Sequence, residues 1–174
     1  MKNFLTLANS LSLFRIFIAP IMVWVILLGW WFTASFFLIL AILSDLFDGP
    51  IARKKKQDTP FGGLLDHSSD AFLVAVLLFS LSKTHDIPLL LPLLVLGSFL
   101  QYALDSKSLA GQKLRMSILG RSNGIAYYVL ASICIFTEAL GITLPGNLFI
   151  FCSWILIAST LVSMTERLWT LLKR

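Results

Sequence analysis

Six long apolar runs divide the chain, and this division restricts the fold more than any other feature. A bilayer core about 30 Å thick is crossed by about 20 helical residues. Of the 174 residues, 57% are hydrophobic and 13% are charged, which is too apolar for a water-soluble domain of this size. The sequence therefore predicts an all-α, polytopic membrane protein that forms one domain over residues 1–174. Its six predicted transmembrane helices fall near residues 11–31, 33–53, 62–83, 87–105, 121–141 and 147–170.

The basic residues are distributed unevenly about these spans. Under this division every lysine and arginine except Lys83 lies at one set of helix ends. Because positively charged loops are retained in the cytoplasm, both termini are expected on the cytoplasmic side. The net charge of +5 is thereby explained by topology, and no nucleic-acid partner is expected. We predict an integral protein of the bacterial inner membrane, embedded in the lipid bilayer.

The N-terminal segment is expected to be retained, because Arg15 interrupts its apolar run and no small-residue cleavage site follows. Apolar residues within it repeat at steps of three and four. Such a stripe is typical either of a short helix lying in the membrane interface or of the first turns of the first span. The residues of this stripe are Phe4, Leu7, Leu11 and Phe14.

The end of the second span carries charges where they are costly to bury. At 100° per residue, Asp45 and Asp48 share one helix face with two very small residues, Gly49 and Ala52. The small residues would leave room for a bulky ligand beside the carboxylates, or would form a packing seam between helices. Arg53, which follows them, offers a planar, forked cation suited to a phosphate.

The start of the third span repeats this pattern. Gly62, Asp66 and Asp70 follow one another at four-residue steps and therefore form one stripe. The hydrophilic turn KKKQDTP between the two spans is short, which predicts that the second and third helices are antiparallel neighbours. The two carboxylate stripes would then face each other near the cytoplasmic end.

Four converging carboxylates form an oxygen-rich site suited to hard divalent cations such as Mg²⁺ or Mn²⁺. An aspartate at mid-membrane costs about 2.5 to 3.5 kcal/mol, so a compensating ligand is expected. One or two of these aspartates could instead be helix-end residues that pair with the neighbouring RKKK run. That explanation does not account for the alignment of both stripes with small residues.

The stretch over residues 45–70 reads D-x-x-D-G-x-x-A-R, then eight residues, then G-x-x-x-D-x-x-x-D. It resembles the signature of the CDP-alcohol phosphatidyltransferase family, and every fixed position matches. The resemblance implies that the chain transfers a phosphatidyl group from CDP-diacylglycerol to an alcohol and releases CMP. It also implies a homodimer, which small-residue faces on the third and fourth spans would allow.

The resemblance also implies a role for each matched position. A pair of divalent ions, Mg²⁺ or Mn²⁺, would be bound by four aspartates, of which the last would also act as general base. The cytidine diphosphate pocket would be lined by the small residues and the arginine of the signature. The implied metal ligands are Asp45, Asp48, Asp66 and Asp70, the implied base is Asp70, and the implied nucleotide residues are Gly49, Ala52, Arg53 and Gly62.

The acceptor alcohol stays open. Relatives that form phosphatidylglycerophosphate or cardiolipin usually read D-P-x-A-D-K over the last two aspartates, whereas this chain reads D-H-S-S-D-A. Glycerol 3-phosphate is the leading candidate, and an inositol phosphate, serine and phosphatidylglycerol are the alternatives. For a phosphorylated acceptor, basic residues between the fourth and fifth spans would bind its phosphate or would serve only as topology signals. They are Lys107, Lys113, Arg115 and Arg121, and Arg121 is preferred because it begins the fifth span.

Two other functional classes would also keep acidic residues in a membrane. A small cation carrier or channel places ionisable groups near mid-membrane on several helices, often with repeat symmetry. A scaffold without catalytic activity gives no reason for the spacing of the small residues and Arg53 from the aspartates. The clustering at one end of two helices favours the enzyme over both.

Overall fold

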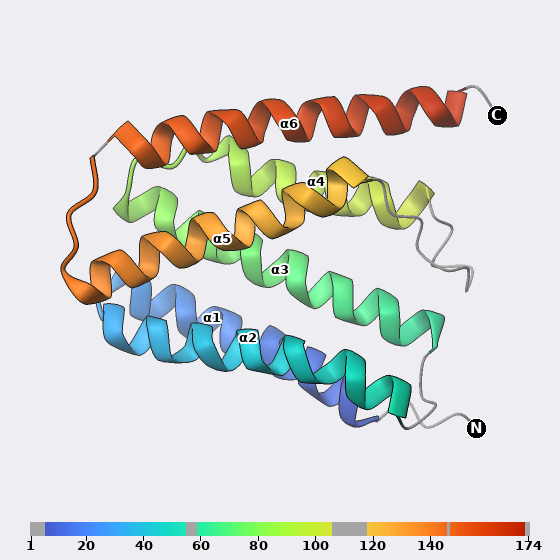
Figure 1. Cartoon of the computed structure of the whole chain (residues 1–174), viewed down its shortest axis with the longest axis horizontal. Coiled ribbons are helices and arrows are strands. Elements are labelled where there is room, and N and C mark those ends of the chain that lie inside the picture. The colour runs from blue at the N-terminus through green and yellow to red at the C-terminus, as the bar shows by residue number, and fades with distance from the viewer. Residues whose placement is uncertain (1–5, 55–58, 106–117, 146, 173–174) are drawn as a thin grey trace.

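Each predicted span corresponds to one α-helix in the computed structural model of the chain (Figure 1). The structure describes residues 6–54, 59–105, 118–145 and 147–172, without the side chains of residues 8, 48, 49, 51–54, 60, 105 and 171. These described residues form no strand, which confirms the all-α class. The helices are α1 (Leu7–Leu27), α2 (Trp31–Lys54), α3 (Pro60–Thr84), α4 (Leu90–Asp105), α5 (Ile118–Leu140) and α6 (Asn147–Leu172).

Local sequence signals explain where the helices of interest begin. The Thr59 side chain caps α3 by accepting a hydrogen bond from the Gly62 N–H at 3.0 Å, and Pro60 occupies the first helical position. Thr6 caps α1 in the same way, accepting from the Asn9 N–H at 3.1 Å. The turn from α1 to α2 contains Gly29 at φ +71°, a left-handed conformation that glycine adopts without steric cost.

The N-terminal apolar stripe belongs to α1. Leu7, Leu11 and Phe14 all lie within this one helix, so in the described part of the chain the stripe forms the first turns of the first span. It does not form a separate interfacial helix there. Phe4, the remaining member of the stripe, lies outside the described residues.

The outer surface of the bundle is strongly apolar. Phe17 is 71% exposed, Trp24 65% and Phe32 76%, and water would be a poor solvent for such a surface. Four helices are long and apolar enough to cross a membrane, namely α1, α3, α5 and α6. The apolar parts of α2 and α4 are shorter, at Trp31–Phe47 and Leu90–Leu104. The structure thus supports four of the six predicted spans by length and composition.

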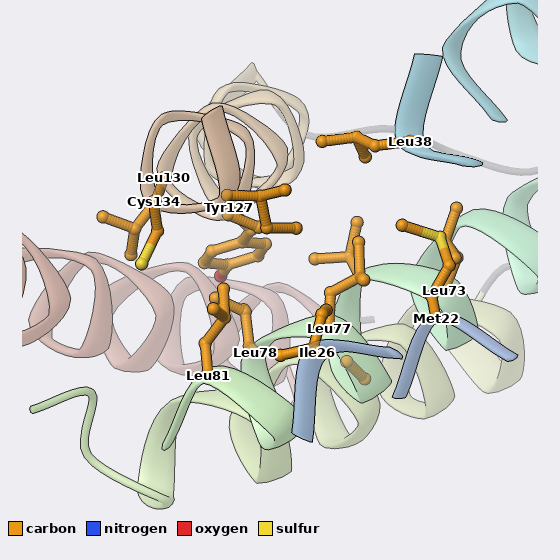
Figure 2. Packing of buried hydrophobic residues seen from close by; sticks show 14 of the residues in the cluster. Met22, Ile26, Leu38, Leu73, Leu77, Leu78, Leu81, Tyr127, Leu130 and Cys134 are labelled. Carbon is orange, nitrogen blue, oxygen red and sulfur yellow. The ribbon is translucent and has the colours of Figure 1, made fainter. Parts of the chain in front are cut away.

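The buried core draws residues from all six helices. Figure 2 shows Met22 and Ile26 of α1 close to Leu73 and Leu77 of α3, with Leu38 of α2 nearby. All five side chains are fully buried. Helix packing in this core fixes the relative positions of the polar residues that lie closer to the ends of the same helices.

Helices α2 and α3 run antiparallel, as predicted (Figure 1), but the predicted direct packing of one against the other is wrong for the described residues. Helix α1 packs against both of them, whereas no packing contact joins α2 directly to α3 among the described residues. A residue of α1 can therefore reach both carboxylate stripes at once.

Candidate functional site

Arg15 of α1 lies at the centre of the acidic cluster. Its Nη1 atom donates to Asp45 Oδ1 of α2 at 2.5 Å and also to Asp70 Oδ1 of α3. Its Nη2 atom donates to Asp66 Oδ1 of α3 and, at 3.3 Å, to Ser12 Oγ in its own helix. The side chain thus joins carboxylates from two helices that do not pack against each other. Sequence reasoning treated Arg15 only as a charge at a helix end.

Burial differs between the two sides of these ion pairs. The Arg15 side chain has no exposed surface, whereas the side chains of Asp45, Asp66 and Asp70 are 52%, 30% and 32% exposed. One guanidinium neutralises only one of these three formal charges, so the cluster keeps negative charge at its accessible side. Such a site attracts further cations and is suited to a divalent one.

The described residues fit a divalent metal ion. One carboxylate oxygen each from Asp66 and Asp70 and one ring nitrogen of His67 lie within 4.8 Å of one another. Carboxylate oxygens are the ligands that Mg²⁺ and Mn²⁺ prefer, and an imidazole nitrogen is a ligand for transition metals. No functional role was predicted for His67, although it stands beside Asp66 in the sequence. Its ring also contacts the Tyr102 ring edge-on, with 6.2 Å between centroids.

A cavity of about 920 Å³ opens beside the carboxylates. It is lined by Asp45, Asp66 and Asp70, and it continues along α5 past Tyr128 as far as Leu140. Residues of α2, α3, α4, α5 and α6 all contribute to its wall, most of them apolar. A ligand with one polar end and a long apolar body would match this shape and polarity.

Two arginines line the same cavity. Arg121 stands in the first turn of α5 and is exposed. Arg167 of α6 lies with its guanidinium 4.7 Å from the centre of the Tyr102 ring. Sequence reasoning counted Arg167 only as a topology signal, because nothing in the pattern of α6 shows that it faces the cavity.

Neutral polar groups also point to a ligand site. The hydroxyl groups of Tyr102 and Tyr128 are buried and find no hydrogen-bond partner in the described part of the chain, and both residues line the cavity. Asn123 is buried and lines the cavity too. Its Oδ1 accepts from Ser159 Oγ at 2.7 Å, while its Nδ2 has no partner among the described residues. Buried groups of this kind are usually satisfied by a ligand or water.

Gly62 is held in close contact with α1. A Cβ atom at this position would lie 3.1 Å from Asn9 Oδ1 and 3.2 Å from Thr59 Oγ1, so a larger residue would push on both. The close approach of α3 to α1 therefore depends on this glycine, in addition to any role beside a ligand.

The structure brings together several predicted site residues but does not describe all of them. Asp45, Asp66, Asp70 and Arg121 line one cavity. The side chains of four predicted residues at the end of α2, and the whole of three predicted residues before α5, lie outside the described part. These are Asp48, Gly49, Ala52 and Arg53, and Lys107, Lys113 and Arg115.

Comparison with known proteins agrees with this geometry. Residues 5–165, almost the whole chain, match the CDP-alcohol phosphatidyltransferase family. The match includes all six helices apart from the last residues of α6. Together with the four long apolar helices, it identifies an integral membrane protein.

Individual relatives cover shorter stretches. The chain is 36% identical over 97 residues to a CDP-diacylglycerol–glycerol-3-phosphate 3-phosphatidyltransferase of Wigglesworthia glossinidia brevipalpis, covering 53% of each chain. It is 41% identical over 69 residues to the protein of the same name from Escherichia coli, covering 38% of each. A probable cardiolipin synthase (CMP-forming) of Drosophila melanogaster is 34% identical over 89 residues, 51% of this chain and 28% of its own. The chain thus matches about half the length, or less, of these relatives.

Proposed function

The chain belongs to the CDP-alcohol phosphatidyltransferase family, and on this premise we propose that it transfers a phosphatidyl group from CDP-diacylglycerol to an alcohol. The observation that carries the proposal is the position of Asp45, Asp66 and Asp70 at the polar end of a long, mostly apolar cavity. A lipid diphosphate has its charge at one end and its apolar mass at the other. The cavity likewise has its carboxylates at one end and mostly apolar surface along the rest of its wall. Nothing in the site favours the cation carrier or the scaffold.

We propose that Asp45, Asp48, Asp66 and Asp70 hold two divalent ions, Mg²⁺ or Mn²⁺, and that His67 adjoins them. When bound, such ions would neutralise the charge of the diphosphate and of the leaving CMP. The residues of the chain supply the rest: carboxylates that orient the ions and an apolar wall that keeps bulk water from the diphosphate. Transfer to water instead of to an alcohol is thereby disfavoured.

Asp70 is proposed as the general base. It lies four residues, about 6 Å, further along α3 than Asp66 and lines the cavity. Asp70 accepts the proton of the acceptor hydroxyl while the alcohol oxygen bonds to the phosphorus that carries diacylglycerol. The bond from that phosphorus to the oxygen of CMP breaks, and CMP leaves with the electron pair. The products are a phosphatidyl alcohol and CMP.

The nucleotide end of the donor is proposed to bind beside the last turns of α2. Gly49, Ala52 and Gly62 would let the cytidine and diphosphate approach the backbone, and Arg53 would donate to a phosphate oxygen. Gly62 also packs closely against Asn9 of α1, so it would serve helix packing as well.

Arg121 is proposed to bind the phosphate of a phosphorylated acceptor, together with Arg167 across the cavity. Lys107, Lys113 and Arg115 remain candidates for the same role. The relatives named for glycerol 3-phosphate make that alcohol the leading acceptor. An inositol phosphate, serine and phosphatidylglycerol are the alternatives, because the D-H-S-S-D-A sequence departs from the usual pattern.

An acceptor panel tests the proposed function. Purified protein is incubated with CDP-diacylglycerol, Mn²⁺ or Mg²⁺ and one alcohol at a time, and released CMP is measured. We expect glycerol 3-phosphate to give the fastest release. Faster release with serine or phosphatidylglycerol would reassign the acceptor without changing the reaction, and no release with any alcohol would refute the proposed function.

The Arg121→Ala variant should separate acceptor binding from donor binding. Loss of a charge-assisted hydrogen bond to phosphate is expected to raise the KM for glycerol 3-phosphate about 10- to 100-fold. The KM for CDP-diacylglycerol should change by less than about threefold, because Arg121 does not face the donor in this proposal. Steady-state kinetics with each substrate varied in turn measure both. Equal changes in the two KM values would argue against the acceptor role.

We further propose that all six helices span the membrane, with both termini and the carboxylates on the cytoplasmic side. Figure 1 supports this arrangement, because the start of α1, the end of α2, the start of α3 and the end of α6 lie at one end of the bundle. The chain is proposed to be a single domain and a homodimer in the bacterial inner membrane.

Cysteine labelling tests this topology. In a background with Cys134 and Cys152 replaced, Gln57→Cys should resist a membrane-impermeant reagent added to intact cells, and Asp86→Cys should react. Gln57 stands in the KKKQDTP turn, whereas the exposed Asp86 follows α3 at the opposite end of that helix. Permeabilised cells serve as control, because both positions should react there. Reaction of Gln57→Cys from outside would place the site on the wrong face for a cytoplasmic nucleotide.

A further inference from the structure

Arg15 contacts the carboxylates of both helices that carry the acidic cluster, α2 and α3. Its guanidinium contacts the Oδ1 atoms of Asp45 on α2 and of Asp66 and Asp70 on α3. The helices α2 and α3 make no direct packing contact among the described residues. The guanidinium of Arg15 bridges them at this level.

A divalent ion that binds these carboxylates from the cavity would lie close to the guanidinium, because Asp45, Asp66 and Asp70 line the cavity and also contact Arg15. Two cations a few ångströms apart repel each other, and the repulsion is stronger near a protein interior than in bulk water. The buried Arg15 side chain is shielded from water that would weaken this repulsion. Contact of the same carboxylates with Arg15 and with a bridging metal ion at the same time is therefore unfavourable.

We propose that Arg15 is a built-in competitor of the divalent metal ion for the carboxylates of Asp45, Asp66 and Asp70. The inference rests on the proposed function only in taking this cluster as the metal site. Without metal, the guanidinium holds the three carboxylates together and prevents their mutual repulsion from separating α2 and α3. When metal binds, the guanidinium gives up its contacts with the carboxylates that the ion takes. Metal affinity is thereby lower than the carboxylates alone would give.

The competition predicts a gain of metal affinity when Arg15 is removed. Protein stripped with a chelator is titrated with Mn²⁺ alone, and free Mn²⁺ is followed by electron paramagnetic resonance. We expect Arg15→Gln to bind Mn²⁺ at least tenfold more tightly than wild type. Arg15→Lys keeps a positive charge but not the planar fork that reaches several carboxylates, so its affinity should lie between the two. Lys83→Gln, which removes an exposed charge at the far end of α3, should change the affinity by less than about twofold.

Thermal unfolding provides the second readout. The metal-free Arg15→Gln protein should melt at a lower temperature than wild type, because its three clustered carboxylates repel one another without their counter-ion. Saturating Mn²⁺ should then raise the melting temperature of Arg15→Gln by more than it raises that of wild type, since tighter binding to the folded state stabilises it more. A variant that folds poorly without metal should be recovered in its presence.

The outcomes distinguish this inference from the proposed function. Wild-type protein that binds Mn²⁺, with Arg15→Gln and Arg15→Lys equal to it or weaker, would overturn the competitor role and leave the metal site standing. Failure of both variants to fold in saturating Mn²⁺ would also overturn it, because metal should replace the guanidinium as counter-ion. Absence of Mn²⁺ binding to wild-type protein would overturn both proposals.

Discussion

Replacement of Asp66 by asparagine should reduce CMP release to background, and chelation of divalent ions should do the same in the wild-type protein. Asp66 belongs both to the group with His67 and Asp70 that fits a metal ion and to the carboxylates that contact Arg15. Asparagine keeps the size of the side chain but offers a neutral oxygen in place of a carboxylate. Removing one such electrostatic group typically costs about 10²- to 10³-fold in turnover. The measurement is CMP release with CDP-diacylglycerol and acceptor at saturation.

The matched control is Asp86→Asn. Asp86 is exposed in the segment between α3 and α4, at the end of α3 opposite to Asp66, so the same chemical change there should leave CMP release unchanged. Circular dichroism and gel filtration in detergent should show that both variants are folded. Full activity of wild-type protein in excess chelator, or of folded Asp66→Asn, would exclude a metal-dependent reaction at this cluster.

The Asp70→Asn variant should bind its donor but fail to turn it over. Asparagine leaves an oxygen toward the cavity but cannot accept the proton of the acceptor hydroxyl. We therefore expect the affinity for CDP-diacylglycerol with metal to stay within about tenfold of wild type, while turnover falls by about 10²- to 10⁴-fold. Binding titrations and single-turnover rates measure the two effects on the same preparation.

Arg53→Ala supplies the opposite pattern as a comparison. Loss of a forked cation from the proposed nucleotide pocket should weaken donor binding more than it slows turnover at saturating donor. The two variants together separate a base from a binding residue. Near-normal single-turnover rates for Asp70→Asn would mean that the proton leaves through water or another residue, and the assignment of Asp70 as base would be wrong.

Much of the fold could be predicted from the sequence. The apolar runs are long and are separated by polar turns, so the number of helices and their bounds, within a few residues, followed from bilayer dimensions and helix geometry. The carboxylates could be placed on one side because Asp66 and Asp70 are four residues apart on one helix. Local periodicity is enough for such predictions, because it requires no knowledge of which helices touch.

The arrangement of the helices could not be predicted in this way. A short turn between α2 and α3 favours direct packing, but both helices pack against α1 and not against each other among the described residues. Arg15 therefore appeared to be a topology charge, although it contacts three of the carboxylates that the sequence analysis had identified. In a single sequence, a buried arginine cannot be distinguished from an arginine that lies at the cytoplasmic surface of the membrane. One usable signal was that Arg15 lies eight residues inside α1, about 12 Å from its start.

The position of Arg167 at the cavity could not be predicted for the same reason. Arg121 was proposed because it begins a span, whereas Arg167 was missed because it lies near the end of α6 among other residues expected at the membrane surface. Its contact with Tyr102 brings together α4 and α6, two helices that are not consecutive in the chain. Tertiary contacts of this kind leave no periodic trace in the sequence.

The most direct test of the account is the stoichiometry of the reaction. Purified wild-type protein, CDP-diacylglycerol, Mn²⁺ and glycerol 3-phosphate are combined, and CMP and the phosphatidyl product are measured together by mass spectrometry. We predict equal amounts of CMP and phosphatidylglycerophosphate, both abolished by Asp66→Asn. The same one-to-one ratio with another alcohol would keep the reaction and change only the acceptor. CMP formed without any phosphatidyl alcohol, or no CMP with every acceptor tested, would contradict phosphatidyl transfer at this carboxylate cluster.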